Sequence, residues 1–559
     1  MRAARIAAVE PLTRRELILS VAVIGVVALV VRILAAVAVP FPIPEDTAYY
    51  YGVARNILEG RGLVSDSLWS FQTPPLVFPR PAFEVWLPLP TFLALVPMAL
   101  FGGSYAAAQA VPILAGTLIP ILAWRLAWDL ATERGLSGTR RATLAIGTGL
   151  TAAIELPLVL HSTLLDSTAL FTVFALVAVM LMTRIAGRPL GARLLDLRLV
   201  ALGVVIGLAA LTRNEALWIG LSWAVIAWFL ARGPDGTRSS RAERFRLVAV
   251  PAVIALAIFA PWAIRDWIAF GNPLPGQAAA NALSITGRDI FAWSDPPTIA
   301  RYLAVGPARL IEMRLFGLNH NLQSVLLFPA FPISLIGILG LPLIFRSWTL
   351  RPLLVLGALI LAITTLAFPV ATTWGTYLHA SGPTHVLLII SCLVGLDALL
   401  TRVGRWRGWT KPVAWLAPLL TVVAALGFTV LLVPSFGGQA RETALRYEAL
   451  EERLVAIGRP IQTLGPVISD YPIWLSEEGG IPTLALPAEP PASVLDLART
   501  FPGTRYVLMS SDEHGPWPAV LAGGDPDAAC FREVDLGTAG DPADAAALEG
   551  TRLWEIVCP

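Results

Sequence analysis

Two adjacent carboxylates, Glu45 and Asp46, stand where a long apolar segment ends. They lie in FPIPEDTAYYYGVARNILEGRGL, residues 41–63, whose later apolar positions recur at helical spacing and predict a short amphipathic helix on the membrane surface. Two acids beside hydrocarbon are costly to desolvate, so they need either open water or a chemical task. The alternatives for Asp46 are therefore capping of this helix and a role in a site.

A third acid, Asp166, starts another apolar segment in HSTLLDSTALF, residues 161–171. As the N-cap of a helix it would need no further explanation. The alternative is that Asp166 faces Asp46 across a cleft, where the two carboxyl groups position a substrate or share a proton. The sequence leaves both alternatives open.

Arginine supplies the side chains that could bind an anion. Arg213 precedes Glu215 in LTRNEALW, in a turn between two apolar segments, and the two side chains either pair with each other or serve a site. Arg265 stands beside Trp262 and Trp267 in PWAIRDWIAFGNPLPG. It either snorkels among interface tryptophans or holds a phosphate with its forked guanidinium group.

Two histidines, His379 and His385, lie in TTWGTYLHASGPTH, and a lone histidine is more often structural than catalytic. The candidate catalytic residues are Asp46, Glu45 and Asp166, and the candidate substrate-binding residues are Tyr50, Arg80, Arg213, Glu215, Arg265 and His379. The sequence contains no HExxH, CxxC or Walker motif. No cofactor is therefore predicted, and a divalent metal stays open.

The composition requires that these residues sit in a membrane protein. Of the 559 residues 56% are apolar and only 14% are charged, which is far too apolar for a soluble globular protein. The net charge is +2 and long basic tracts are missing from the sequence, so nucleic acid is excluded as a partner. The chain is predicted to be a polytopic α-helical protein of the cell membrane.

The elements that position the candidate residues are apolar segments of about 20 residues, the length needed to cross a bilayer. They run approximately over 17–39, 84–101, 104–130, 142–160, 167–183, 197–212, 214–231, 246–264, 324–346, 351–370, 383–400 and 412–433. Arginine-rich connections such as TRVGRWRGWTK belong in the cytoplasm by the positive-inside rule. Their placement requires that one early segment does not cross, and the proline-rich segment 84–101 is the better candidate. About 11 crossings remain, with a cytoplasmic N-terminus and outer loops 41–103 and 265–323.

The part from 435 to 559 differs in composition from the membrane domain, 1–434. A charged segment with helical spacing, ARETALRYEALEERL, is followed there by short apolar runs between turn-rich stretches. This pattern predicts a small soluble α/β domain on the extracytoplasmic side. Cys530 and Cys558 both lie in this part. They are expected to pair if the domain faces an oxidising compartment.

Several motifs together resemble those of a known class of enzymes. An N-terminal anchor, an outer loop with PEDTAYYYGVARNILEGRGL and a proline-interrupted helix ending in LFGGS resemble the opening of the GT-C class of membrane glycosyltransferases. Within that class the chain is similar to the protein O-mannosyltransferase and aminoarabinose-transferase superfamily. LTRNEAL, PWAIRDWIAFGNPLPG and TWGTYLHASGP also look like stretches of bacterial members, and the resemblance covers roughly residues 15–400.

The resemblance implies roles for individual residues. An acid in the first outer loop is the catalytic base of that class, which falls on Asp46 with Glu45 adjacent, and a second acid in the next outer loop falls on Asp166. The donors are sugars on polyprenyl phosphate, taken from the membrane. The chain departs from the class after the first loop, where the basic-proline signature is reduced to PRPAFEVW with Arg80 as its one cation.

The implied reaction is transfer of a sugar to an acceptor hydroxyl at the outer face of the membrane. Asp46 would deprotonate the hydroxyl, Asp166 would position the acceptor, and Arg213 with Arg265 would neutralise the departing phosphate. Direct displacement at the anomeric carbon would invert its configuration. The acceptor, whether glycan, lipid or protein, is not identified. The alternative is a transporter or flippase of a lipid-linked sugar, which is less favoured because most charges lie at segment ends.

Overall fold

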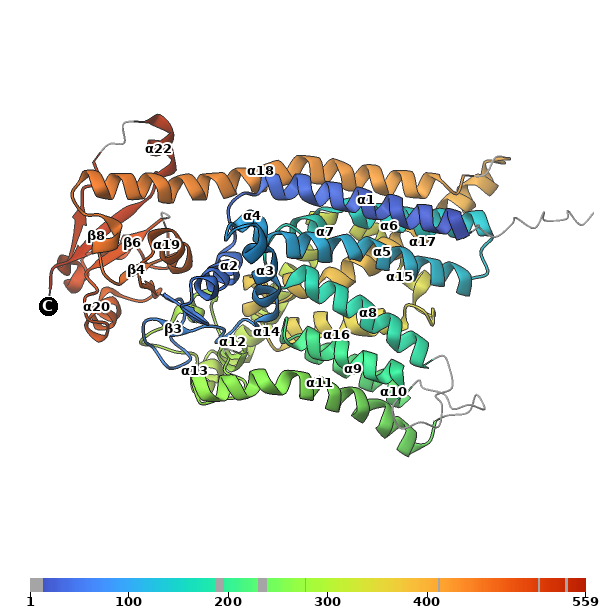
Figure 1. The fold of residues 1–559 in the computed structure, drawn as a ribbon, viewed down its shortest axis with the longest axis horizontal. Helices are drawn as coiled ribbons and strands as arrows, with labels where there is room; N and C mark the ends of the chain where they lie inside the picture. The colour runs from blue at the N-terminus through green and yellow to red at the C-terminus, as the bar shows by residue number, and fades with distance from the viewer. Residues whose placement is uncertain are drawn as a thin grey trace, which may run out of the picture.

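The structure is a computed structural model that describes residues 14–186, 196–229, 239–276, 278–410, 413–510, 513–537 and 541–558. A bundle of helices makes up most of it, and a six-stranded sheet lies at one end of the bundle (Figure 1). The long helix α18, Leu416–Ala456, runs along the edge of the bundle and reaches the sheet. The bundle and the sheet are therefore joined by one continuous helix.

Among the described residues, six helices are long and apolar enough to cross a membrane. They are α1 (Arg14–Ala38), α4 with α5 (Tyr105–Ala108 and Ala110–Glu133), α8 (Thr168–Ala186), α11 (Arg241–Phe270), α17 (Gly382–Trp406) and α18. A seventh span results if Gly306–Ala330, which begins with α14 (Gly306–His320), and α15 (Ile333–Ile344) form one unit bent by 110°. The finding agrees with a multi-pass membrane protein.

Four further apolar helices are shorter, between 10 and 17 residues. They are α3 (Leu89–Phe101), α9 (Leu197–Ala210), α10 (Ala216–Phe229) and α16 (Arg351–Leu366). With about 1.5 Å of rise per residue, a helix needs about 20 residues to cross the hydrocarbon core of a bilayer. The count of about 11 crossings therefore stays a prediction. The orientation does too, because Arg2, Arg5 and the loop residues 187–195 and 230–238 lie outside the described part of the chain.

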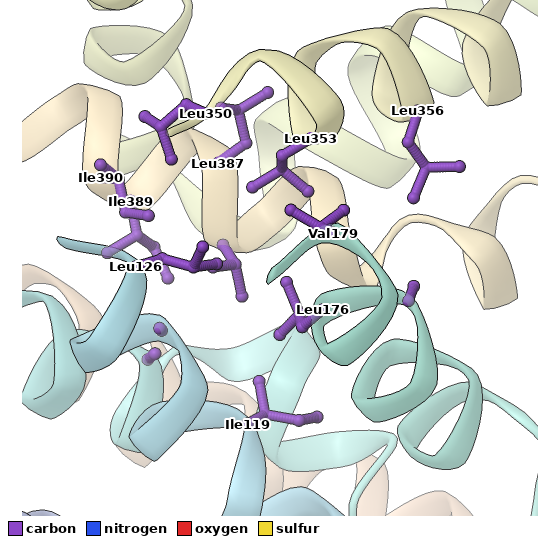
Figure 2. Close-up of a cluster of buried hydrophobic side chains, with 14 of the residues drawn as sticks. Ile119, Leu126, Leu176, Val179, Leu350, Leu353, Leu356, Leu387, Ile389 and Ile390 are labelled. Atoms are coloured by element: carbon purple, nitrogen blue, oxygen red, sulfur yellow. The ribbon is translucent and has the colours of Figure 1, made fainter. Parts of the chain in front are cut away.

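The centre of the bundle is packed with apolar side chains from helices that are distant in sequence (Figure 2). The labelled side chains come from α5, α8, α16, α17 and the turn before α16: Ile119, Leu126, Leu176, Val179, Leu350, Leu353, Leu356, Leu387, Ile389 and Ile390. Lipid is as apolar as these side chains, so close packing rather than burial from water holds such helices together. Glycine permits that closeness at α15, where a Cβ atom on Gly340 would lie 2.6 Å from the carbonyl oxygen of Ser391 in α17.

The segment between α1 and α3 contributes a strand to the C-terminal sheet. After α2 (Glu45–Leu58), strand β1 (Val64–Ser65) pairs antiparallel with β3 (Arg80–Pro81). Strand β2 (Ser67–Leu68) instead pairs in parallel with β5 (Thr483–Ala485). The loop that carries Asp46 is therefore built into the sheet at the far end of the chain.

The sheet has the strand order β2-β5-β4-β6-β8-β7. Its remaining strands are β4 (Val467–Ser469), β6 (Tyr506–Met509), β7 (Phe531–Val534) and β8 (Arg552–Ile556), and the helices α19 (Pro472–Gly479) and α20 (Pro491–Thr500) lie between strands in the chain. A disulfide joins Cys530 to Cys558, which confirms that pairing. Because α18 passes through position 435 without a break, the separate extracytoplasmic domain stays a prediction.

Candidate active site

A cavity of about 1320 Å³ lies among the bundle helices, the segments 44–87 and 274–291, and α19. Its lining is mostly apolar, and α2, α7 (Leu156–Leu160), α10, α11 and α19 all contribute to it. The titratable acids, histidines and arginine that line it are Glu45, Asp46, His161, Arg213, Glu215, Asp266 and His379. Few polar groups in a large apolar cavity are typical of a ligand site.

Asp46 lies in the first turn of α2, which begins after Pro44. Pro44 is the N-cap and has no side-chain hydrogen bond to offer, so Asp46 is not the cap of this helix. The Asp46 Oδ1 atom accepts a hydrogen bond from its neighbour's backbone, Thr47 N, at 2.9 Å. A helix N-terminus favours negative charge there, and the second carboxylate oxygen, Oδ2, points to His379.

Asp166 stands between α7 and α8 and makes two kinds of contact. Its Oδ1 atom accepts a hydrogen bond from Thr168 N at the start of α8, at 2.7 Å. Its Oδ2 atom lies 2.8 Å from His161 Nδ1 and 3.5 Å from His379 Nδ1. One carboxylate oxygen of Asp166 therefore binds the start of α8 and the other faces the two histidines, while its role in a site stays a prediction.

His379 connects the two acids. It belongs to the short helix η5 (Leu378–Ala380), and its Nε2 atom lies 3.2 Å from Asp46 Oδ2. Its other ring nitrogen, Nδ1, lies 2.7 Å from the Thr168 hydroxyl and faces Asp166. One imidazole thus bridges carboxylates from α2 and from the start of α8.

Burial and charge act together on this cluster. Burial raises the pKa of Asp46, and the neighbouring His379 only partly opposes the rise. For Asp166 burial alone would raise the pKa, but His161 and His379 hold it well below its usual range. The two carboxylates raise the pKa of His379 in spite of its burial. The pKa of Asp166 is thus lowered while those of His379 and Asp46 are raised, so Asp46 is the more basic of the two carboxylates.

Arg213 brings a fixed positive charge to the same cavity. Its guanidinium group binds Glu215 through two hydrogen bonds of 2.8 and 3.0 Å, and it donates a third to Ser167 Oγ at 2.7 Å. Tyr50 lines the cavity on the side of Arg213 and Ser167. Arg213 and Glu215 thus pair with each other and also line the cavity.

Comparisons with known proteins give the fold a class. Neither a protein-family model nor a curated protein matches the chain. Among solved structures, the oligosaccharyltransferase of Archaeoglobus fulgidus tethered with an acceptor peptide matches with a TM-score of 0.54 and 15% identity, over 92% of this chain and 72% of that one. ArnT from Cupriavidus metallidurans bound to undecaprenyl phosphate matches with a TM-score of 0.51 and 14% identity, over 97% and 98%. Both are GT-C glycosyltransferases. This chain has the GT-C fold.

The GT-C fold confirms the resemblance that the opening motifs indicated. A third match is the archaeal oligosaccharyltransferase AglB from Archaeoglobus fulgidus in complex with an inhibitory peptide and a dolichol-phosphate, with a TM-score of 0.51 and 15% identity, over 88% of this chain and 69% of that one. ArnT and this chain cover each other almost completely. The comparison therefore includes both the bundle and the C-terminal sheet.

Within the GT-C fold, Glu45 points away from its neighbour Asp46. Its Oε1 atom accepts hydrogen bonds from Ile473 N at 2.9 Å and Trp474 N at 3.3 Å, in the first turn of α19. Burial raises its pKa to about 8, although these two backbone hydrogen bonds oppose the rise. A carboxyl group that is largely protonated at neutral pH and bound to a helix start is poorly suited to be a base. Glu45 ties α2 to α19 instead.

Arg80 lies outside the cavity lining and is fully buried. It forms an ion pair of 3.0 Å with Glu84, donates to the carbonyl oxygens of Ser70 and Thr73, and its partner Glu84 accepts a hydrogen bond from Tyr49 at 3.1 Å. These contacts hold the residues between β2 and α3 in place. The placement speaks against the predicted substrate-binding role of Arg80, because its guanidinium group cannot reach a ligand in the cavity.

Arg265 also lies outside the cavity lining, although the next residue, Asp266, is part of it. The guanidinium group pairs with Asp266 at 2.9 Å and stacks 4.8 Å from the centre of the Trp262 ring. This arrangement is the alternative in which Arg265 rests among interface aromatics. Of the two arginines expected to hold phosphate, Arg213 is the one that reaches the cavity.

Three side chains of the cluster form a possible metal-binding group. Ligand atoms of His161, Asp166 and His379 lie within 4.8 Å of one another. Two imidazoles and a carboxylate are a common ligand set for zinc and similar divalent ions. The same atoms also hydrogen-bond within the protein, because Asp166 binds His161 and the Thr168 hydroxyl binds His379. The prediction that no cofactor is needed stays a prediction.

Sequence reasoning missed His161, although it begins the HSTLLDSTALF stretch that carries Asp166. A break between two helices can fold a histidine back onto an acid five residues later, and the structure does so. The available signal was a polar run, HST and DST, on both sides of two leucines at a segment end. Thr168 was hidden by the same break, since its hydroxyl matters only once His379 has packed against it.

Proposed function

We propose that this chain transfers a sugar from a polyprenyl-phosphate donor to an acceptor hydroxyl at the outer face of the membrane, with inversion at the anomeric carbon. The observation that carries the proposal is the bridge from Asp46 through His379 to Asp166 in a cavity that also holds Arg213. The similar structures are an oligosaccharyltransferase with an acceptor peptide and ArnT with undecaprenyl phosphate, which supports a lipid-phosphate donor.

The cavity suits a lipid carrier because its apolar part continues between the membrane helices. Residues from α9, α10 and α11 line it, down to Val248 near the start of α11. Leu217 and Leu256 line the cavity and are still 65% and 66% exposed, so this part is open on the lipid-facing side of the bundle. A polyprenyl chain could lie there while its phosphate reaches Arg213.

The proposed chemical step balances as a direct displacement. The Asp46 carboxylate takes the proton of the acceptor hydroxyl, and the hydroxyl oxygen forms the new bond to the anomeric carbon as the bond from that carbon to the phosphate oxygen breaks. The electron pair leaves on the lipid phosphate, whose charge Arg213 stabilises. Attack and departure on opposite faces of the carbon invert its configuration. General base catalysis of this kind contributes roughly 10²–10⁴-fold.

His379 and Asp166 support the base in this proposal. Protonated His379 would keep Asp46 ionised between turnovers, and Asp166 would hold the imidazole in place and position the acceptor. Arg213 is already paired with Glu215, so protonated His379 is the cation that would offset the charge of Asp46 and Asp166. We therefore propose that the reaction needs no resident metal. We also propose the orientation expected from the sequence, in which the N-terminus is cytoplasmic and the C-terminal sheet is extracytoplasmic.

The experiment uses the purified chain in nanodiscs with a panel of undecaprenyl-phosphate-linked sugars and an extract of host membranes as the acceptor source. Mass spectrometry measures free undecaprenyl phosphate and glycosylated product. We expect both to appear with at least one donor in the panel, and to disappear with Asp46→Asn. The competing transport function gives a different result: in vesicles, labelled donor would change leaflet without release of undecaprenyl phosphate.

A further inference from the structure

A second acid and histidine pair lies behind the site and takes no part in the proposed reaction. Glu155 stands at the junction of α6 (Gly138–Ile154) and α7, and His385 lies in the first turn of α17. Glu155 Oε1 is 3.6 Å from His385 Nδ1, and the two side chains are only 2% and 1% exposed. A pair buried this deeply at the outer ends of two helices needs a physical reason, because desolvating it is costly.

The pair does not satisfy its own hydrogen-bonding groups. Within the described part of the chain, neither ring nitrogen of His385 has a hydrogen-bond partner, and neither does Glu155 Oε2. The contact of 3.6 Å between them is too long to count as a hydrogen bond. A buried polar group without a hydrogen-bond partner destabilises the fold, so at least one more polar partner is expected beside His385.

A small cavity beside His385 has room for that partner. Its volume is about 10 Å³, close to the smallest space that holds one water molecule. Besides His385, the polar residues that line it are His161, Thr168, Thr172 and Ser381. A buried water needs two to four polar neighbours, and this lining supplies them.

His161 connects the small cavity to the candidate active site. It lines both the small cavity and the large one, and its Nδ1 atom binds Asp166. One ring thus faces the site with one edge and the small cavity with another part of its surface. Whatever occupies the small cavity therefore contacts a side chain that holds Asp166 in place.

We propose that one water molecule bound in the small cavity bridges His385 to His161, and that Glu155 and His385 act through it as positioning residues for His161 and Asp166. The inference rests on the proposed function only for its effect on sugar transfer. The binding of the water itself follows from the geometry of the small cavity. Glu155 fixes the His385 ring, the His385 ring orients the water, and the water fixes the ring of His161.

The expected effect is that of an outer-shell partner of a site histidine. Loss of such a partner typically lowers activity by about 10–100-fold. His385→Leu should therefore lower kcat by about 10–100-fold. The KM for the donor should stay unchanged, because neither His385 nor Glu155 lines the large cavity. His385→Gln keeps hydrogen-bonding groups in the same place and should restore most of the lost rate.

Matched variants separate this role from simple packing. Ser391→Ala removes another buried polar group from α17, one that bonds to Gly337 O on a different neighbour, and should leave kcat unchanged. Equal rates for His385→Leu and the native chain, in folded protein, would overturn the positioning role. So would a His385→Gln variant as slow as His385→Leu.

A direct test does not depend on activity. A high-resolution structure of the full chain in nanodiscs should show one water within hydrogen-bond distance of both His161 and His385, and the water should be lost in His385→Leu. A well-resolved cavity without water density in the native chain would overturn the proposal. If the water is seen and no sugar transfer is found with any donor, the proposed function fails while the binding site stands.

Discussion

The Nε2 atom of His379 lies 3.2 Å from the Oδ2 atom of Asp46. The two residues come from the first turn of α2 and from η5, which are far apart in the chain, and both line the large cavity. The other nitrogen of the same imidazole, Nδ1, contacts Thr168 and Asp166. The arrangement of the site therefore depends on one ring.

Replacement of His379 should weaken the base without removing it. In His379→Leu, Asp46 loses the cation that opposes the rise of its pKa, so a larger fraction of Asp46 is protonated at neutral pH. We expect kcat to fall by about 10–100-fold, with partial recovery as the pH is raised. Initial rates of undecaprenyl phosphate release between pH 6 and 9 measure this. A uniform loss at every pH would show that His379 does not act on the protonation of Asp46.

Removal of the Arg213 side chain should weaken donor binding. Hydrogen bonds to charged groups contribute about 1.5–3 kcal/mol each, so Arg213→Ala is expected to weaken the binding of undecaprenyl phosphate by about 10–100-fold. Arg265→Ala is the matched control, because Arg265 is outside the cavity lining and pairs with Asp266. Binding isotherms in nanodiscs compare the two variants. An equal loss of binding in both variants would mean that the total positive charge, and not the position of Arg213, determines the affinity for undecaprenyl phosphate.

Removal of divalent metal should leave the activity intact. The ligand atoms of His161, Asp166 and His379 already bind protein groups, and the neighbouring carboxylates raise the pKa of His379, which in the proposed mechanism provides the positive charge that a metal would otherwise bring. We expect the rate after extensive treatment with EDTA to equal the rate before it. Loss of activity that Mn²⁺ or Zn²⁺ restores would assign the three residues to a metal site.

His514 should make the contact between residues 287–291 and the C-terminal part of the chain sensitive to acid. Its Nδ1 atom is 2.6 Å from Nη1 of Arg288 in η1 (Gly287–Phe291), and its Nε2 atom is 2.7 Å from Leu486 O. In the neutral ring Nδ1 accepts a hydrogen bond from Arg288, and Nε2 donates one to Leu486 O. Burial, together with Arg288, lowers the pKa of His514 from its ordinary value of 6.5 to about 4.

The sign of this effect follows from proton binding. Between pH 6.5 and 4 the unfolded chain binds a proton at His514 and the folded chain does not, so the stabilisation is complete above pH 6.5 and is lost as the pH falls towards 4. The loss amounts to about 3 kcal/mol. The midpoint of thermal unfolding should therefore fall less on acidification in His514→Gln than in the native chain. Parallel curves for both proteins would contradict this.

The sequence indicated the class of fold and part of the site. Asp46, Asp166, Arg213 and His379 could be brought to one face because segment ends and charged loops reveal which residues share a side of the membrane. The GT-C resemblance came from motifs in the same outer loops. Such arguments place a residue on a face, and they do not say which way its side chain points.

The parts that escaped prediction depend on contacts between distant segments. The sequence predicted Glu45 as a second candidate for the base. In the structure its carboxylate accepts hydrogen bonds from the start of α19, more than 400 positions later in the chain. Arg80 was assigned to substrate, yet Glu84 and nearby carbonyl oxygens enclose it. Strand β2 has two residues and can be recognised only by its pairing with β5. No local pattern encodes these contacts, because they arise only when the segment between α1 and α3 folds against itself and against the C-terminal sheet.

Asp46 is the general base in the proposed mechanism, and its carboxylate is the group whose loss should slow transfer most. The most direct measurement compares the rate of undecaprenyl phosphate release by Asp46→Asn and by Glu45→Gln, at saturating donor and with donor binding measured on the same preparations. Glu45→Gln keeps an acceptor oxygen for α19 and should retain the native rate. We predict that Asp46→Asn binds the donor normally and transfers sugar about 10²–10⁴-fold more slowly. Transfer by folded Asp46→Asn at the native rate would contradict the claim.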